Sequence, residues 1–300
     1  YKKPAPRWET VLDLDALAAA EKEGWVWHGA SCLYPKYDRC LVHLSRGGAD
    51  AEVVREFDTV KKAFVADGFT LPEARSSVAW KDRDTLYVAT DFGPDTLTRA
   101  GTPRIVKEWR RGTPLSAART LFEGAVTDLG VDASREVGPR IQPRDWLSRA
   151  TSFYTSDLYL FDGTKYVQID KPADATFSAW EQEALISLRS AWTVNGRIWP
   201  AGALLTTPLA DYLAGKREFT ALFEPRPNAS LEAYSATRSA IFVTELVDVN
   251  NEIYVHRRGK AGWTRSKLDT PAIVSFRVAA YDSDVSDDYW FYDNSFTSPY

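Results

Sequence analysis

Histidine, serine and cysteine are the side chains best suited to acid–base, covalent or metal chemistry, and this chain carries few of them. Its three histidines, His28, His43 and His256, lie in strand-like runs that we assign to separate repeat units. No two of them have the short spacing that places metal ligands on one face of a helix. We therefore predict that each is an ordinary strand histidine, neither a ligand nor a catalytic base.

A serine nucleophile has no sequence support. The G-x-S-x-G pattern, which presents the nucleophile of an α/β-hydrolase on a sharp turn, does not occur. The run Ser45-Arg46-Gly47-Gly48 has the composition of a hairpin turn, and it leads into no Gly-Lys-Ser of a phosphate loop. We predict no catalytic and no cofactor-binding residue in this chain.

Acidic residues near the C-terminal end offer the best candidate for a metal site. Asp282, Asp284, Asp287 and Asp288 lie close together but lack the glycine and final glutamate of an EF-hand loop. We therefore predict a solvated turn between strands and no metal site. The sequon Asn228-Ala229-Ser230 would matter only in a eukaryotic secreted protein.

Net charge limits the partners of this chain, whereas its two cysteines leave the compartment open. Cys32 and Cys40 would form a disulfide if they ended neighbouring strands, but we expect two buried thiols. A net charge of −4 argues against nucleic-acid binding. The sequence contains no run of 18 apolar residues, the length needed to span a membrane. We expect a cytoplasmic protein, with a periplasmic location left open, and neither nucleic acid nor membrane as a partner.

Eleven tryptophans suggest either sugar stacking or packing between sheets. Trp80, Trp109 and Trp180 lie within or beside strand-like runs, so we favour packing for them. Trp146 and Trp199 lie nearer to loops, and we expect them to be the most exposed.

A repeated unit of short strands must position all these residues. Residues 78–124 show it best, because VAW-KDRD-TLYVATD, RIVKEWR and ARTLFEG alternate with Asp, Gly and Pro turns over the length of one propeller blade. Similar units recur roughly every 50 residues. They open at Trp25, Val78, Val126, Thr176, Leu231 and Ile273.

Turns and helices complete the predicted elements. Asp162-Gly163 is the strongest hairpin signal. Residues 13–23 predict a short helix and residues 211–216 another, and neither could serve as the repeated crossover helix of a βαβ fold. Residues 9–14 resemble the closing strand of an incomplete blade, and residues 273–294 supply two strands of another. Five complete units and two fragments predict an all-β, seven-bladed propeller in a single domain, residues 1–300.

Several of these stretches resemble one family. LSRGGADAEVVREFD, and FVADGFTLPEARSSVAWKDRDTLYVATDFGPDTLTRAGTPRIVKEWRRGTPL after it, are similar to the propeller domain of bacterial prolyl-oligopeptidase-like (S9) serine peptidases. The likeness is most specific over residues 47–114. It extends to ETVLDLDALAAAEKEGWVWHGA, to LRSAWTVNGRIWPAGALL and to the final FTSPY.

The resemblance implies a seven-bladed propeller that caps an α/β-hydrolase domain, with the active site between them. Because the Ser, Asp and His of the family's triad belong to the hydrolase domain, we expect this chain alone to lack hydrolytic activity. We also expect the family's N-terminal segment to be absent. The implied role is gating and size selection in a peptidase that cleaves short peptides, with its own hydrolase domain as partner. A self-standing interaction scaffold, or a carbohydrate-active propeller with facing carboxylates, are the alternatives.

Overall fold

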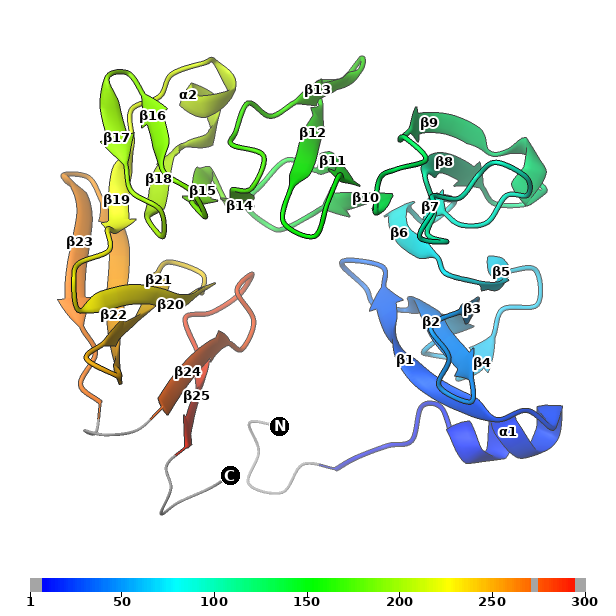
Figure 1. Ribbon diagram of the computed structural model, residues 1–300. Coiled ribbons are helices and arrows are strands. Elements are labelled where there is room, and N and C mark those ends of the chain that lie inside the picture. The colour runs from blue at the N-terminus through cyan, green and yellow to red at the C-terminus, as the bar shows by residue number, and fades with distance from the viewer. Residues whose placement is uncertain (1–6, 271–274, 295–300) are drawn as a thin grey trace. The chain divides into compact units, whose positions relative to one another are not determined.

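Strands dominate the computed structural model, which describes residues 7–270 and 275–294 (Figure 1). The chain divides into two compact units, which are described separately. Unit 1 comprises residues 1–137 and 143–168, and unit 2 comprises residues 138–142 and 169–300.

Three sheets build unit 1, and their strands follow one another in chain order, as in a propeller blade. In sheet 1 the strand order is β1-β2-β3-β4, and β5 also pairs with β3. Sheet 1 contains β1 (Trp25–Cys32), β2 (Arg39–Arg46), β3 (Glu52–Asp58), β4 (Ala63–Phe64) and β5 (Thr70–Ala74). Sheet 2 contains β6 (Ser77–Asp82), β7 (Thr85–Ala89), β8 (Ile105–Arg110) and β9 (Arg119–Glu123), with a 3-10 turn at Leu115–Ala117. Sheet 3 contains β10 (Gly130–Glu136), β11 (Arg144–Ala150), β12 (Ser156–Phe161) and β13 (Tyr166–Gln168).

Unit 2 repeats the pattern, with an additional hairpin inserted in its first sheet. The hairpin lies between β15 and β18, where the sequence Asn195-Gly196 supplies the turn. Sheet 4 contains β14 (Thr176–Trp180), β15 (Glu183–Ser187), β18 (Leu204–Pro208) and β19 (Thr220–Phe223), and the hairpin is β16 (Trp192–Val194) with β17 (Arg197–Trp199). Sheet 5 contains β20 (Ala229–Ala236), β21 (Ile241–Val247), β22 (Asn250–Gly259) and β23 (Gly262–Lys267); β24 (Ser275–Ala280) pairs with β25 (Tyr289–Asn294) as sheet 6.

The core lies between neighbouring sheets, because alternate side chains of each strand point to opposite faces. In unit 1, Leu41 and Val54 of sheet 1 pack against Trp80 and Leu86 of sheet 2. In unit 2, sheet 4 packs in the same way against sheet 5, and sheet 5 against sheet 6. Burial of these apolar faces supplies the main stabilisation of each unit.

Two short helices lie where the sequence predicts them. Helix α1 (Leu14–Glu21) begins after Asp13, whose carboxylate accepts a hydrogen bond from the Ala16 amide at 2.9 Å. Its apolar side packs against the face of sheet 1 turned away from sheet 2. Helix α2 (Leu209–Leu213) begins two residues before the predicted segment.

Some predicted boundaries are wrong. Residues 9–13 form no strand, and Leu14 already belongs to α1. The third unit begins with a strand at Gly130 rather than at Val126, and strand β11 was not predicted. Ile273 lies outside the described residues. The Asp162-Gly163 turn is confirmed, because Asp162 accepts hydrogen bonds from the amides of Thr164 and Lys165. The blade count of seven stays a prediction.

Candidate functional site

A cavity of about 490 Å³ opens at one end of the three sheets of unit 1. This end is called the hairpin end, because the first two strands of each sheet connect there. The β1–β2 connection provides Leu33 to Lys36 and Asp38, and Trp80 forms part of the wall from β6. The other lining residues are Ser31, Cys32, Ala79, Lys81, Asp82, Arg83, Ser134, Arg135, Val137 and Pro143.

A disulfide between Cys32 and Cys40 closes the β1–β2 connection. The expectation of two buried thiols is therefore wrong. The two residues are directly opposed in the antiparallel register of β1 and β2, with Cα atoms 3.9 Å apart, so the folded strands bring their sulfurs together. Beyond the bond, the amide of Leu33 donates to the carbonyl of Arg39 at 2.8 Å and closes the loop.

The side chains of the second sheet fix the position of this loop. The buried Trp80 indole donates to the carbonyl of Ser31 at 2.9 Å. Arg83 pairs with Asp38 through two contacts, at 3.0 and 3.3 Å. The hydrogen bond from Arg83 holds the pKa of Asp38 below its ordinary value. The Trp80–Ser31 hydrogen bond and the Arg83–Asp38 pair therefore tie the loop of sheet 1 to sheet 2.

The basic residues of the cavity wall are largely neutralised by acidic neighbours. Lys81 donates to Glu108 at 2.7 Å, and Arg135 pairs with Asp145 at 3.0 Å. Burial raises the pKa of Glu108, but the hydrogen bond and charge of Lys81, together with Arg119, outweigh it and lower the pKa. A carboxylate held ionised in this way is a poor proton donor near neutral pH.

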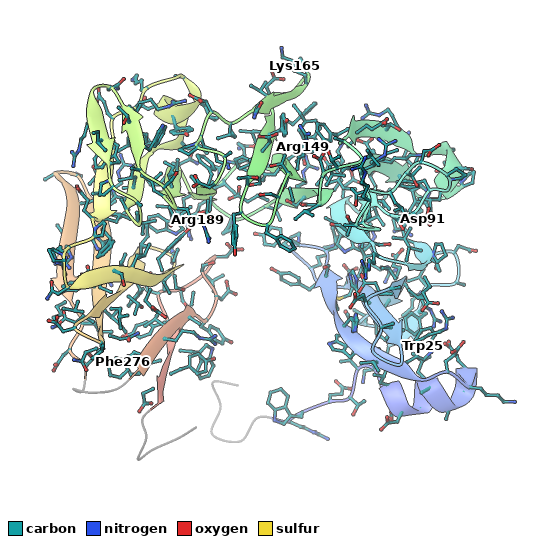
Figure 2. The ribbon with its side chains drawn as sticks, in the orientation of Figure 1. Trp25, Asp91, Arg149, Lys165, Arg189 and Phe276 are labelled. Carbon is teal, nitrogen blue, oxygen red and sulfur yellow. A yellow bond between two sulfur atoms is a disulfide. The ribbon has the colours of Figure 1, made fainter. Side chains whose placement is uncertain are left out.

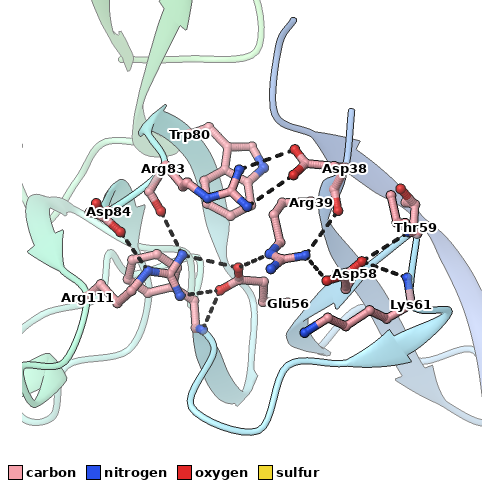
Figure 3. Close-up of polar contacts among 12 residues, drawn as sticks. Asp38, Arg39, Glu56, Asp58, Thr59, Lys61, Trp80, Arg83, Asp84 and Arg111 are labelled. Atoms are coloured by element: carbon pink, nitrogen blue, oxygen red, sulfur yellow. Dashed lines mark hydrogen bonds and ion pairs between the residues drawn. The ribbon is translucent and has the colours of Figure 1, made fainter. Parts of the chain in front are cut away.

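Glu56 centres a second charged cluster, between sheets 1 and 2 (Figure 3). Its buried carboxylate accepts from Arg111 at 2.7 and 3.1 Å and from the Phe69 amide at 3.0 Å. Arg39 approaches to 3.4 Å and also pairs with Asp58. Burial lowers the pKa of Arg111, whereas hydrogen bonding to Glu56 raises it, and the net pKa is raised. This cluster links two sheets and offers no group poised for proton transfer.

The opposite end of unit 1 carries the β7–β8 connection, residues 90–104, which is longer than any connection within the other two sheets of the unit. The β7–β8 connection is held by Arg104, whose guanidinium donates to the Asp95 carbonyl at 2.9 Å and to Glu123. Arg149, labelled in Figure 2, donates to both carboxylate oxygens of Asp128, at 2.8 and 3.1 Å, and so lowers the pKa of that carboxyl group. Between β11 and β12, Phe153 is 88% exposed.

Two of the histidines share one glutamate. The Nδ1 atom of His43 lies 2.6 Å from Glu52, and that of His28 lies 3.6 Å from it. The assignment of the histidines to separate units is therefore wrong for this pair, because both strands belong to sheet 1. Among residues 7–270 and 275–294, no group of three or more His, Cys, Asp or Glu side chains is arranged to hold a metal ion. His256 is buried in sheet 5, and burial lowers its pKa to about 4.

The tryptophans are mostly packing residues. The expected exposure of Trp199 and Trp146 is wrong: Trp199 is 3% exposed, and Trp146 lies half-buried on β11, where its indole donates to Glu136 at 2.9 Å. A loop-like sequence context did not predict burial, because the contacts are not local: the Trp199 ring packs against Phe219, and Trp146 bonds to Glu136 on the neighbouring strand. Trp80 and Trp109 are buried, as predicted.

The acidic run forms the turn between β24 and β25, as predicted, and one of its exposed members is also hydrogen-bonded to sheet 5. Asp287 accepts hydrogen bonds from the Ser239 amide and the Thr237 hydroxyl, each at 2.7 Å. Burial raises the pKa of Asp287, and these hydrogen bonds more than compensate and lower it. This carboxylate therefore ties sheet 6 to the β20–β21 connection of sheet 5.

Successive antiparallel sheets whose strands follow chain order are typical of β-propeller blades. Residues 2–300 match the family described as prolyl oligopeptidase, N-terminal beta-propeller domain. The chain therefore belongs to this family, which confirms the predicted fold class and the resemblance to the S9 peptidases.

Curated relatives and solved structures agree with this assignment. The uncharacterized peptidase y4nA of Sinorhizobium fredii is 34% identical over the whole chain, and the uncharacterized peptidase RP174 of Rickettsia prowazekii is 26% identical over 95% of it. The chain spans 42% of each relative. A post-proline cleaving enzyme from Rickettsia typhi superimposes with a TM-score of 0.88 at 24% identity, over 97% of this chain and 44% of that one.

One further feature concerns membranes. Within the described ranges, no helix has the length and apolar character needed to cross a bilayer.

Proposed function

We propose that this propeller gates and size-selects substrates for the hydrolase domain of a prolyl-oligopeptidase-type serine peptidase. The observation that carries the proposal is the match of residues 2–300 to the N-terminal propeller domain of that family. The chain also spans only 42% of two peptidases, which leaves room for a catalytic domain in such proteins. In this proposal the two units together form one propeller domain with seven blades.

The local structure supports a rigid gate rather than a catalytic part. Neighbouring sheets of each unit are joined by apolar packing and, in unit 1, by the buried Glu56 cluster. A stiff assembly of sheets can exclude large substrates while loops at its ends remain adaptable. Of the carboxylates that line the cavity, Asp38 is paired with Arg83 and Asp82 accepts a hydrogen bond from the Asp84 amide, so their role is to position the loops.

The test compares substrate lengths in the complete gene product. Short and long peptides that share one scissile sequence are assayed with the whole protein and with its hydrolase domain alone. Gating predicts that the whole protein cleaves only the short peptides, whereas the separated domain, if folded, loses this preference. Equal preference in both forms would refute gating. A serine-directed inhibitor should abolish cleavage in both, and its failure would remove the serine-peptidase assignment itself.

The substrate class is part of the same proposal. We infer cleavage of short peptides after proline, supported by the likeness to the post-proline cleaving enzyme from Rickettsia typhi. Matched chromogenic peptides with proline, alanine or arginine before the scissile bond would test it with the whole protein. Preference for a residue other than proline would overturn this part and leave gating untouched.

The compartment is a separate proposal. We expected the cytoplasm, but the Cys32–Cys40 disulfide supports the periplasmic alternative, because disulfides persist in oxidising compartments. Cell fractionation combined with thiol trapping in intact cells would decide. A reduced protein that accompanies cytoplasmic markers would refute the periplasmic location.

A further inference from the structure

The disulfide at the hairpin end of unit 1 has chemistry that a rigid gate does not require. Cys32 is exposed and lines the cavity, whereas Cys40 is buried, with 3% of its surface exposed. We propose that the Cys32–Cys40 bond is a thiol–disulfide exchange site that a dithiol reductant opens in the folded protein, releasing the 33–38 wall of the cavity.

The exchange is directed by the different exposure of the two residues. A thiolate of the reductant attacks the sulfur of Cys32, the S–S bond breaks, and Cys40 leaves as a thiolate that takes a proton from water. The second thiolate of the reductant then attacks the reductant's first sulfur in the mixed disulfide. Cys32 leaves as a thiolate and also takes a proton from water. Two electrons pass to the protein, which gains two thiols, and the reductant ends as a cyclic disulfide.

The position of the bond determines what its reduction changes. Cys32 and Cys40 are the last opposed pair of β1 and β2, so the disulfide closes the base of the loop that follows. Next to it, the Leu33 amide donates to the Arg39 carbonyl, and the Tyr37 amide donates back to the Leu33 carbonyl, both at 2.8 Å. The bond between Leu33 and Arg39 forms only while the ends of the strands stay together.

Other contacts keep the surrounding fold in place after reduction. The Trp80 indole still holds the Ser31 carbonyl, and Arg83 still pairs with Asp38. The Thr59 hydroxyl donates to the Tyr37 carbonyl at 2.9 Å. These contacts anchor the two sides of the loop but not its exposed middle, which includes Lys36. Reduction should therefore increase motion locally, within residues 33–38, without unfolding sheet 1.

The first experiment asks whether a dithiol reaches the bond in the native protein. The protein is treated with dithiothreitol without denaturant, its thiols are alkylated, and the labels are located by mass spectrometry. We expect Cys32 and Cys40 to be labelled while the circular dichroism spectrum stays native. Labelling that requires denaturant would overturn the proposal.

The second experiment asks whether reduction releases the cavity wall. A lysine-specific protease is used to follow cleavage after Lys36, with cleavage after the exposed Lys61, in the β3–β4 turn of the same sheet, as an internal control. Reduction should accelerate cleavage after Lys36 by on the order of tenfold, because local opening exposes the backbone, and leave cleavage after Lys61 unchanged. Equal rates after Lys36 in the two redox states would refute the release of the wall.

A variant separates loss of the bond from effects of the reductant. The double variant Cys32→Ser, Cys40→Ser should be cleaved after Lys36 at the reduced rate with or without dithiothreitol. If the variant retains the slow rate of the oxidised protein, the disulfide does not hold the loop. Acceleration at both lysines would show general destabilisation and would also count against a local switch.

Discussion

Glu56 in unit 1 and Glu245 in unit 2 are both buried carboxylates paired with two arginines, and they differ in the solvation of those arginines. The side chains of Arg39 and Arg111, around Glu56, are 17% and 26% exposed. Those of Arg226 and Arg265, around Glu245, are 45% and 41% exposed. The same pairing chemistry therefore operates in a drier and in a wetter environment.

The two clusters also differ in what they connect. Arg111 follows strand β8 of sheet 2, so its bonds to Glu56 join that sheet to sheet 1 (Figure 3). Arg265 lies on β23 and Arg226 just before β20, so Glu245 mainly organises a single sheet. An unpaired cation costs more where water cannot replace its partner, so the drier cluster should be the more sensitive to mutation.

The largest effect is expected at the drier cluster. Replacing Glu56→Gln leaves Arg39 and Arg111 partly buried without their shared anion, and should lower the free energy of unfolding by about 3 kcal/mol. Urea denaturation followed by fluorescence measures the change. Asp84→Asn, at an exposed partner of Arg111, is the matched control and should cost less than about 1 kcal/mol. Equal losses for the two variants would show that burial of the charged groups does not determine the cost of removing their partner.

Acid should weaken unit 2 through His256, which lies close to Arg265 and Glu245. Its folded-state pKa of about 4 is below the ordinary value of 6.5, so the unfolded chain binds the proton first. Stability present above pH 6.5 is therefore lost as the pH falls towards 4, by about 3 kcal/mol. Urea titrations across this range should show the loss, and His256→Gln should remove it. An unchanged pH dependence in the variant would assign the loss to other groups.

A smaller effect is expected at the wetter cluster. Glu245→Gln should lower the free energy of unfolding by about 1.5 kcal/mol, because water can solvate Arg226 and Arg265 once the anion is gone. The same urea experiment applies, with Glu252→Gln, a carboxylate paired with the exposed Lys267, as control. A loss as large as that of Glu56→Gln would end the proposed distinction between the clusters.

The smallest effect, and of opposite sign, is expected at Asp132 on β10. Burial raises the pKa of Asp132, and a hydrogen bond with Ser148 offsets only part of this rise. Its folded-state pKa lies above the unfolded one, so ionisation at neutral pH opposes folding. Asp132→Asn should therefore raise stability at pH 7 by about 0.5 kcal/mol, with a gain that shrinks as the pH falls. Thermal melts at several pH values measure it, and Asp128→Asn, at an arginine-paired carboxylate, should destabilise instead. A destabilised Asp132→Asn would show that its charge has a favourable partner.

Local sequence signals predicted the elements well where their cause is local. Alternating apolar residues and turn residues located most strands, and Asp13 and Asp162 marked a helix start and a hairpin turn. The missed strand β11 has a sequence, RDWLSRA, whose charged residues conceal its alternation. Their partners lie on the neighbouring strand β10 or in the connection before it, as with Arg149 and Asp128.

The candidate site was less predictable than the fold. Sequence reasoning named Cys32 and Trp80, but it did not indicate that they line one cavity with Asp38 and Arg83. No signal in the sequence predicted the Arg83–Asp38 pair, because its members lie 45 residues apart. A short cysteine spacing with a turn between was the one available signal for the disulfide.

The sequence by itself determined the repeating strands, the turns between them and the lack of a G-x-S-x-G nucleophile turn, since each depends on residues close together in the chain. The tertiary structure alone decided that Cys32 and Cys40 bond, that Trp199 is buried, and that the arginines around Glu56 are less exposed than those around Glu245. Strand register and the packing of one sheet on another bring distant residues together and remove water from between them. Burial and pairing of charges follow from that packing, and no local pattern encodes them.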